Sequence, residues 1–258
     1  SWLSDHGYET TAVVTNPHLT RDRNFHVGFD NFRNLRIGEG QSTDGDSTGG
    51  WDIGSIMYGF RDRMRTYNSR INPYTIPYVL YRYYQFRSSW PTIPANRVTQ
   101  GLKDEIESFQ QPFFVWSHFM DLHAPINPKS ISDGGLADGR SPAQFLLSDA
   151  ARTARIESPS YTAMYDSALR FIDTQIGELL DALDRYNCLD DTIIILTSDH
   201  GEVLFDRYDI YGHPRHYLYD DLLHVPLLVK VPDEDGVRIH QPFSLGWIHE
   251  VISDLLEI

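Results

Sequence analysis

The sequence predicts an α/β protein with three layers, in which a mostly parallel central sheet carries helices on both faces. Three observations predict this class. Along the 258 residues, patterns follow in the order helix, strand, helix, strand, helix, strand, strand, helix. The strands are continuous apolar runs, which is typical of a sheet buried on both sides. Three of the strands end in polar side chains, and ligands of such sheets gather at the carboxyl ends of the strands.

The N-terminal part of the chain supplies one strand and one clear helix. Residues 8–16, YETTAVVTN, are short and rich in β-branched side chains, which predicts a buried strand. Gly7 is expected to close a helix before that strand. Residues 38–98 combine a Gly- and Ser-rich loop with mixed arginine and aromatic residues, and we expect an insertion that covers one edge of a single domain spanning 1–258. Residues 99–110 show the apolar spacing of a helix.

The C-terminal part supplies the longest helix and three further strands. Residues 160–186 place apolar side chains at intervals of three and four, which predicts an amphipathic helix. Apolar runs predict strands within 112–125, 192–200 and 224–232, and the closing residues 246–258 are expected to form another amphipathic helix.

Composition excludes some functions. The net charge is -14 and the pI is about 5.1, so binding to a nucleic-acid backbone is not expected. No apolar run reaches the ~18 residues of a membrane span. The single cysteine, Cys188, allows no intrachain disulfide.

The composition of charged residues is unusual, because only three of the 22 basic residues are lysines and aspartate far outnumbers glutamate. Such a surface suits a protein in concentrated salt, where screening weakens self-repulsion. We therefore hypothesise a halophilic source and a soluble, cytoplasmic protein. An ordinary acidic protein from a GC-rich genome is the alternative.

Asp199 and His200 form the strongest local signal for chemistry. They stand together where the strand TIIILTSDH ends, and a carboxylate beside an imidazole suits a divalent ion. A simple hydrogen-bonded pair at the strand end is the alternative.

Further histidines lie near other breaks in the chain. His123 follows the strand within 112–125 and precedes prolines, which hold it in one orientation. His118 and Asp121, just before it, are expected to support the strand end. His213 and His216 lie on a loop stiffened by proline, where they either contact a bound anion and protonate a leaving group or face solvent.

The motifs resemble the sulfatase family of the alkaline-phosphatase-like superfamily. The resemblance rests on YDSALRFIDTQIGELLDALDRYNCLDDTIIILTSDHGE, HFMDLHAPINP and LYDDLLHVPLLV, and on HGYETTAVVTNPHL near the start and FSLGWIHEVISDLLEI at the end. All occur in the family's order.

The resemblance implies an alkaline-phosphatase-like fold and a sulfate-ester hydrolase with a divalent ion, calcium or manganese, held partly by Asp199 and His200. It implies that His123 contacts the anionic group or the leaving oxygen, and that His213 or His216 touches the substrate. Asn16 and His18 fall near a lysine and histidine pair of the family that binds substrate, with the lysine replaced. The substrate would be a small-molecule or glycan sulfate or phosphate ester.

One family feature has no match: the nucleophile motif, C/S-x-P-x-R, does not occur. We therefore expect the chain to begin inside a longer protein, to bind its ion weakly and to be inactive alone. Two alternatives stay open. One is a phosphodiesterase, phosphatase or phosphoryl-transfer enzyme of the same superfamily, with two metals and His213 or His216 as a ligand. The other is a truncated or degenerate binding domain. Nothing in the sequence indicates the oligomeric state.

Overall fold

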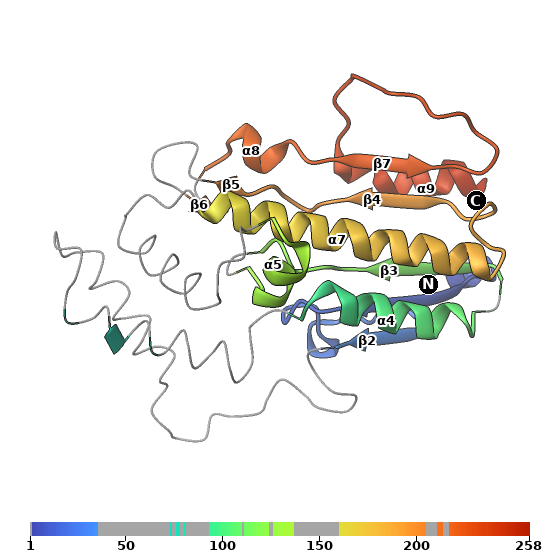
Figure 1. Ribbon diagram of the computed structural model, residues 1–258. Helices are drawn as coiled ribbons and strands as arrows, with labels where there is room; N and C mark the ends of the chain where they lie inside the picture. The colour runs from blue at the N-terminus through green and yellow to red at the C-terminus, as the bar shows by residue number, and fades with distance from the viewer. Residues whose placement is uncertain are drawn as a thin grey trace.

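The computed structural model describes residues 2–35, 73, 76–77, 80, 93–109, 111–123, 126–136, 160–204, 211–213 and 217–258. Within these ranges the chain alternates strands and helices, as Figure 1 shows, and the predicted α/β class is confirmed. The expected insertion at 38–98 lies almost entirely outside the described residues and stays a prediction.

The first sheet has three parallel strands in the order β2-β1-β3. Strand β1 (Glu9–Val14) lies at its centre, between β2 (Asn31–Asn34) and β3 (Phe113–Ser117). Apart from Glu9, the residues of β1 are buried, as expected of a strand covered on both faces.

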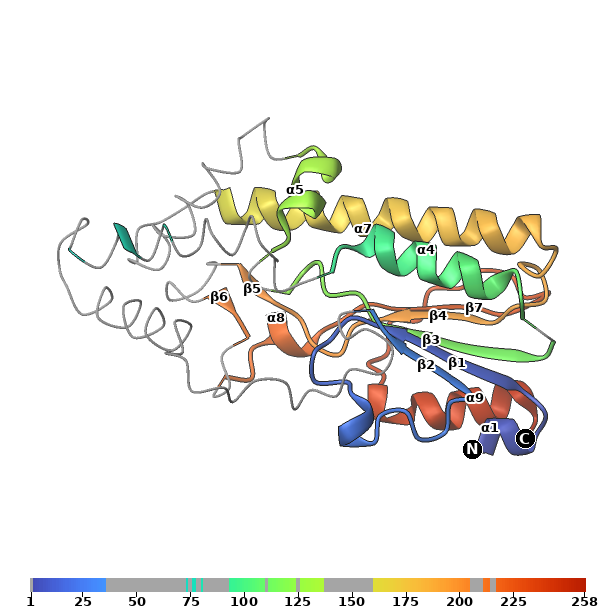
Figure 2. The ribbon, with the colours of Figure 1, turned by 90° about the horizontal axis from the view of Figure 1, so that it is seen from below.

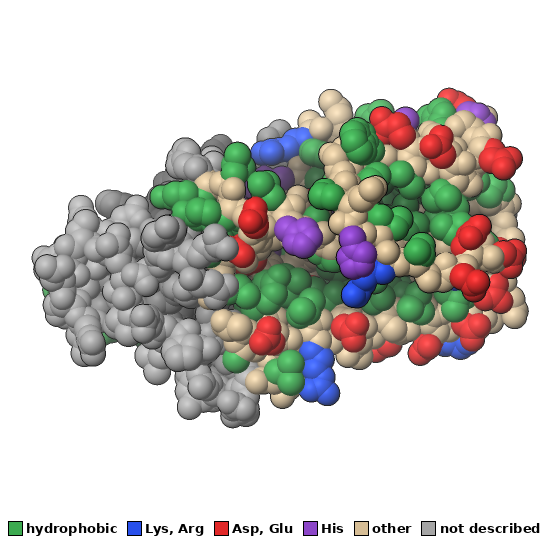
Figure 3. All heavy atoms as spheres, turned by 90° about the horizontal axis from the view of Figure 1, so that it is seen from above, with side chains coloured by type: hydrophobic (Ala, Val, Ile, Leu, Met, Phe, Trp, Pro, Cys, Tyr) green, Lys and Arg blue, Asp and Glu red, His purple; other side chains and the backbone are tan. Residues whose placement is uncertain are grey.

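The second sheet pairs β4 (Ile194–Thr197) with β7 (Leu227–Lys230), and these two strands are antiparallel. Among the described residues, β3 and β4 belong to separate sheets, although Figure 1 shows them side by side. The expectation of burial on both faces is wrong for this pair, since Leu196, Leu228 and Val229 are exposed. Figure 3 shows apolar side chains among acidic ones on the side of the molecule where α8 and β7 lie.

Helices cover both sides of the strands, as Figure 2 shows: α4 (Ala95–Ile106) and α7 (Ser160–Arg185) on one face, α1 (Trp2–Asp5) and α9 (Ile248–Leu256) on the other. The apolar stripe of α4 supplies Val98 and Leu102, which pack with Val13 of β1 in a buried cluster. Helix α1 ends before Gly7, whose φ of 86° fits the predicted cap.

Shorter elements gather near the carboxyl ends of the strands. They are α5 (Pro128–Gly134), the hairpin of β5 (Val203–Leu204) and β6 (Tyr211–Gly212), and α8 (Asp220–Leu223). Two 3-10 turns, η1 (Arg21–Arg23) and η2 (Leu245–Trp247), complete the described elements. No helix in the described ranges is both long enough and apolar enough to cross a membrane.

Candidate active site

Asp199 and His200 follow β4 with only Ser198 between, at the point where the backbone leaves the sheet. Asp199 Oδ2 lies 3.9 Å from His200 Nε2, and the backbone N–H of His200 donates to Asp199 Oδ1 over 3.0 Å. His200 Nδ1 lies 2.8 Å from the carbonyl oxygen of Gly201. A carbonyl only accepts, so Nδ1 carries the proton and Nε2 has the free lone pair.

Gly201 lets this turn pack against α8. Its N–H donates to the carbonyl of Leu222 over 2.9 Å, and a Cβ at this position would lie 1.9 Å from the carbonyl oxygen of Asp221. Only a residue without a side chain fits here, so the glycine fixes where Asp199 and His200 stand.

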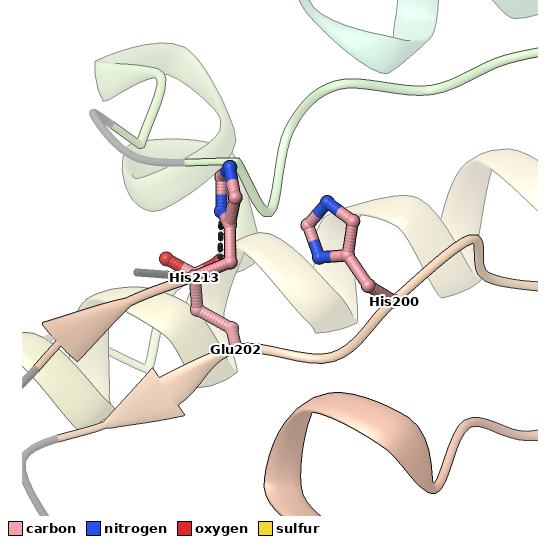
Figure 4. Close-up of side chains that lie close together, drawn as sticks. All are labelled: His200, Glu202 and His213. Carbon is pink, nitrogen blue, oxygen red and sulfur yellow. Dashed lines mark hydrogen bonds and ion pairs between the residues drawn. The ribbon is translucent and has the colours of Figure 1, made fainter. Parts of the chain in front are cut away.

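Glu202 and His213 face one another across the hairpin, as Figure 4 shows. Strand β5 pairs with β6 so that Val203 lies opposite Gly212, and the same register sets Glu202 opposite His213. The Glu202 side chain is 5% exposed, and its Oε2 accepts a hydrogen bond from His213 Nδ1 over 3.4 Å. A buried carboxylate thus orients an imidazole that is still 38% exposed.

His200 and His213 come from different segments, yet their ring centroids lie only 4.3 Å apart. His123, from the loop after β3, has its ring centroid 4.9 Å from that of His213, in an edge-on arrangement. Three imidazoles predicted as site residues are therefore brought together.

Burial and neighbouring charges act on the pKa of the histidines. Burial lowers the pKa of His213, with a further decrease from His200 and an opposing increase from Asp199. Burial likewise lowers the pKa of His118, against an increase from Asp199. Both rings are therefore biased toward the neutral form, in which one nitrogen donates and the other accepts.

Asp121 is fully buried and supports the strand end, as predicted. Its Oδ1 accepts from the N–H of Ala95, the first residue of α4, over 3.0 Å, and it also accepts from the hydroxyl of Ser130 in α5. The side chain thus ties the loop after β3 to two helices.

Two further predicted residues, Asn16 and His18, lie apart from the histidine group. Asn16 Oδ1 accepts from the N–H of His18 over 2.8 Å, so the Asn16 amide shapes its own loop, and His18 is exposed. Within the described part of the chain, no hydrogen bond or ring contact joins either residue to the histidines. Their predicted role in substrate binding stays a prediction. His216 lies outside the described residues.

Glu202 belongs to the motif TSDHGE, but sequence reasoning does not predict a role for it. The available signal was its position two residues after His200, which in an extended segment places both side chains on the same side. What the sequence does not reveal is the hairpin that brings His213 opposite.

The side chains of Asp199 and His200 supply part of a site for a divalent ion. Asp199 Oδ2 and His200 Nε2 are close enough for one ion at bond lengths of roughly 2.0–2.6 Å to touch both. Two ligands leave most of the coordination of calcium or manganese unfilled, so further ligands are required.

Residues 1–257 match the family model named Sulfatase. The chain belongs to the sulfatase family. This confirms the resemblance seen in the motifs, and the strand end bearing Asp199 and His200 is therefore part of a sulfatase domain.

Curated sulfatases match over shorter stretches. Endo-4-O-sulfatase of Bacteroides thetaiotaomicron is 23% identical over 155 residues, covering 58% of this chain and 30% of that protein. Arylsulfatase K of Homo sapiens is 30% identical over 108 residues, covering 42% and 20%. Each match with these curated relatives takes in less than a third of the relative's length.

Two solved structures resemble this sulfatase-family chain. The lipoteichoic acid synthase LtaP from Listeria monocytogenes is 14% identical with a TM-score of 0.48, covering 91% of this chain and 46% of that one. The phosphonate monoester hydrolase of Agrobacterium radiobacter is 18% identical with a TM-score of 0.46, covering 88% and 51%.

Proposed function

We propose that this chain is part of a metal-dependent hydrolase of sulfate esters. The observation that carries the proposal is the meeting of His123, His200 and His213 beside Asp199, at the carboxyl ends of strands in a sulfatase-family domain. In α/β sheets this edge is where ligands bind.

His213 is the proposed general acid. Breaking the bond between sulfur and the ester oxygen leaves a negative oxygen, and the imidazolium of His213 would give that oxygen its proton. Glu202 holds Nδ1 and so directs Nε2 away from the hairpin. An anionic substrate favours the protonated ring, which offsets the effect of burial on its pKa.

His123, whose ring lies against that of His213, would contact the sulfate group or the leaving oxygen. Asp199 and His200 would hold the divalent ion, calcium or manganese, together with ligands from outside this pair. The ion, when bound, would stabilise negative charge that develops on the ester.

The test uses the full protein that contains these residues, with a chromogenic aryl sulfate and the matching phosphate. We expect sulfate turnover that is lost on chelation and restored by calcium or manganese. His213→Gln should lower kcat by roughly 10²- to 10⁴-fold for an alkyl or glycan sulfate, but far less for the aryl ester, whose leaving oxygen needs no proton.

His240→Gln is the matched control, because His240 is exposed in the segment before η2. No turnover of either ester with any divalent ion would refute the proposal and favour a binding domain. Faster turnover of the phosphate would assign the chain to phosphoryl chemistry instead.

A further inference from the structure

Three donor atoms converge on the hairpin in an arrangement that the proposed catalytic roles do not require. His200, Glu202 and His213 each offer a nitrogen or a carboxylate oxygen, and these atoms lie within 4.8 Å of one another (Figure 4). We propose that these three residues form a binding site for a transition-metal ion of the zinc class. Because His200 would serve both sites, an ion bound here prevents Asp199 and His200 from holding theirs.

The donor set selects the metal. Two imidazole nitrogens and one carboxylate oxygen suit zinc, cobalt or nickel, whereas calcium and magnesium prefer a cage of oxygen atoms. Zinc with three such protein ligands keeps one position open for water or another ligand. Asp199 and His200 offer only one imidazole beside a carboxylate, whereas this site offers two imidazoles, so the two sites differ in the ions they prefer.

The backbone holds the three donors near the required geometry. Glu202 and His213 are opposed by the register of β5 and β6, and side chains placed so are neighbours. Zinc bonds of about 2.0–2.2 Å place the donor atoms of tetrahedral ligands roughly 3.4 Å apart. The three donor atoms here lie within 4.8 Å of one another, so rotations of the side chains bring them to that separation without moving the strands.

Burial of Glu202 adds a second reason. Its side chain is 5% exposed, and a carboxylate removed from water is stabilised by a cation or by hydrogen bonds. In the structure, the N–H at His213 Nδ1 donates to Glu202 Oε2 over 3.4 Å, so the two side chains already face one another. A metal ion between the two residues would replace that proton and interact with both.

His200 is common to both proposed ions. A neutral imidazole has one free lone pair, so it binds one ion at a time. If the proposed function holds, zinc bound here withdraws His200 from the catalytic ion and His213 from the leaving group. The hairpin is then an inhibitory metal site, through which zinc competes with calcium or manganese.

The binding test uses the full chain freed of metal and titrated with Zn²⁺, followed by calorimetry, and with Co²⁺, whose visible absorption reports low coordination number. We expect one ion per chain. Glu202→Gln and His213→Gln should weaken binding by more than the roughly 10- to 100-fold that loss of a group supporting a ligand costs. Asp199→Asn and the exposed control Asp235→Asn should change it little.

Two variants are used because substitution of the buried Glu202 could unfold the protein and so abolish binding indirectly. Substitution of the half-exposed His213 is less disruptive. Circular dichroism checks that each folds. Binding that survives both changes, or is lost with Asp199→Asn alone, would overturn the proposal, and so would the absence of any zinc binding.

Catalysis gives an independent readout. Turnover with calcium or manganese but no zinc binding overturns this site and leaves the proposed function intact. Zinc binding without any ester turnover upholds the site and refutes the function. With both present, zinc should inhibit wild-type turnover, and an excess of manganese should relieve the inhibition.

Discussion

At the scale of single residues, Asp121 is a fully buried carboxyl whose ionisation affects the stability of the fold. Burial raises its pKa from 3.8 to about 6, although the hydrogen bonds from Ser130 and Ala95 oppose the increase. Its Oδ2 is buried and has no hydrogen-bond partner among the described residues. This position therefore stabilises the protonated carboxyl of Asp121 relative to the ionised form.

This predicts how stability changes with pH. Between about pH 4 and pH 6 the folded chain keeps a proton on Asp121 that the unfolded chain has released, so this group makes stability fall as pH rises through that window. Asp121→Asn should remove this decrease in the free energy of unfolding. In the wild type the decrease amounts to roughly 3 kcal/mol by pH 7. Urea unfolding from pH 4 to pH 7 measures it.

Asp30 offers a contrast of opposite sign. Hydrogen bonds from the Thr10 N–H and hydroxyl lower the pKa of Asp30, so its contribution is present above its ordinary pKa and lost as pH falls. Asp30→Asn should therefore leave the fall between pH 4 and pH 6 in place. Parallel pH profiles for wild type and Asp121→Asn would contradict the prediction.

The sequence predicts which residues carry the chemistry, but it does not predict how these residues are arranged in space. Asp199, His200 and His123 are predicted site residues because they stand where apolar strands end, and His213 because it lies on a loop stiffened by proline. The sequence gives no distance between them, since their approach depends on which strands are neighbours and on the β5–β6 hairpin. Glu202 gained a role only when that hairpin set it opposite His213.

At the scale of elements, α5 and α7 touch backbone to backbone. A Cβ on Gly134 would lie 1.8 Å from the carbonyl oxygen of Ser167 in α7. Helix α5 begins at a cap where Asn127 accepts from the N–H of Lys129, and it ends at Gly135 with a φ of 70°. The short helix thus has defined ends and one point of close approach.

Gly134→Ala should therefore force α5 away from α7 and destabilise the fold by about 1–3 kcal/mol or more. The matched change is Gly177→Ala, inside α7, where an added Cβ meets nothing within 4 Å. That change should stabilise the fold by roughly 0.5–1 kcal/mol, because alanine restricts the unfolded chain and favours helix. Urea unfolding compares the two, and shifts of the same sign would contradict the close contact.

Long elements were predicted well and short ones were missed, for a physical reason. Helix α7 repeats its apolar pattern over seven turns, and residues 160–186 were expected where Ser160–Arg185 is found. Strand β2 has four residues, of which only Phe32 is buried, and β5 and β6 have two each. Strands of two to four residues are too short to show the alternation of apolar and polar residues that identifies a strand. Their pairing depends on the strands beside them.

At the scale of the whole molecule, charge is the dominant property. A net charge of -14 repels itself in the compact state, and salt screens that repulsion. We expect the melting temperature in sodium chloride to rise from dilute buffer to molar salt. Differential scanning calorimetry measures the rise, and a protein fully stable in dilute buffer would refute the halophilic hypothesis.

A charge-reduced variant serves as the control. Glu234→Gln with Asp235→Asn removes two negative charges from an exposed segment, so the increase with salt should be smaller than in wild type. An equal increase would mean that salt acts through burial of apolar surface and not through screening.

The wide separation of the strand ends along the chain has a consequence for how the protein is made. The Thr15 hydroxyl donates to the carbonyl of His118, 103 positions later, and the histidine group is complete only at His213. A ribosome must therefore release most of the chain before the imidazoles can meet. Contacts so distant in sequence form slowly. We expect the nascent chain to hold its first sheet and α4 as an early unit, with the chemistry assembled last.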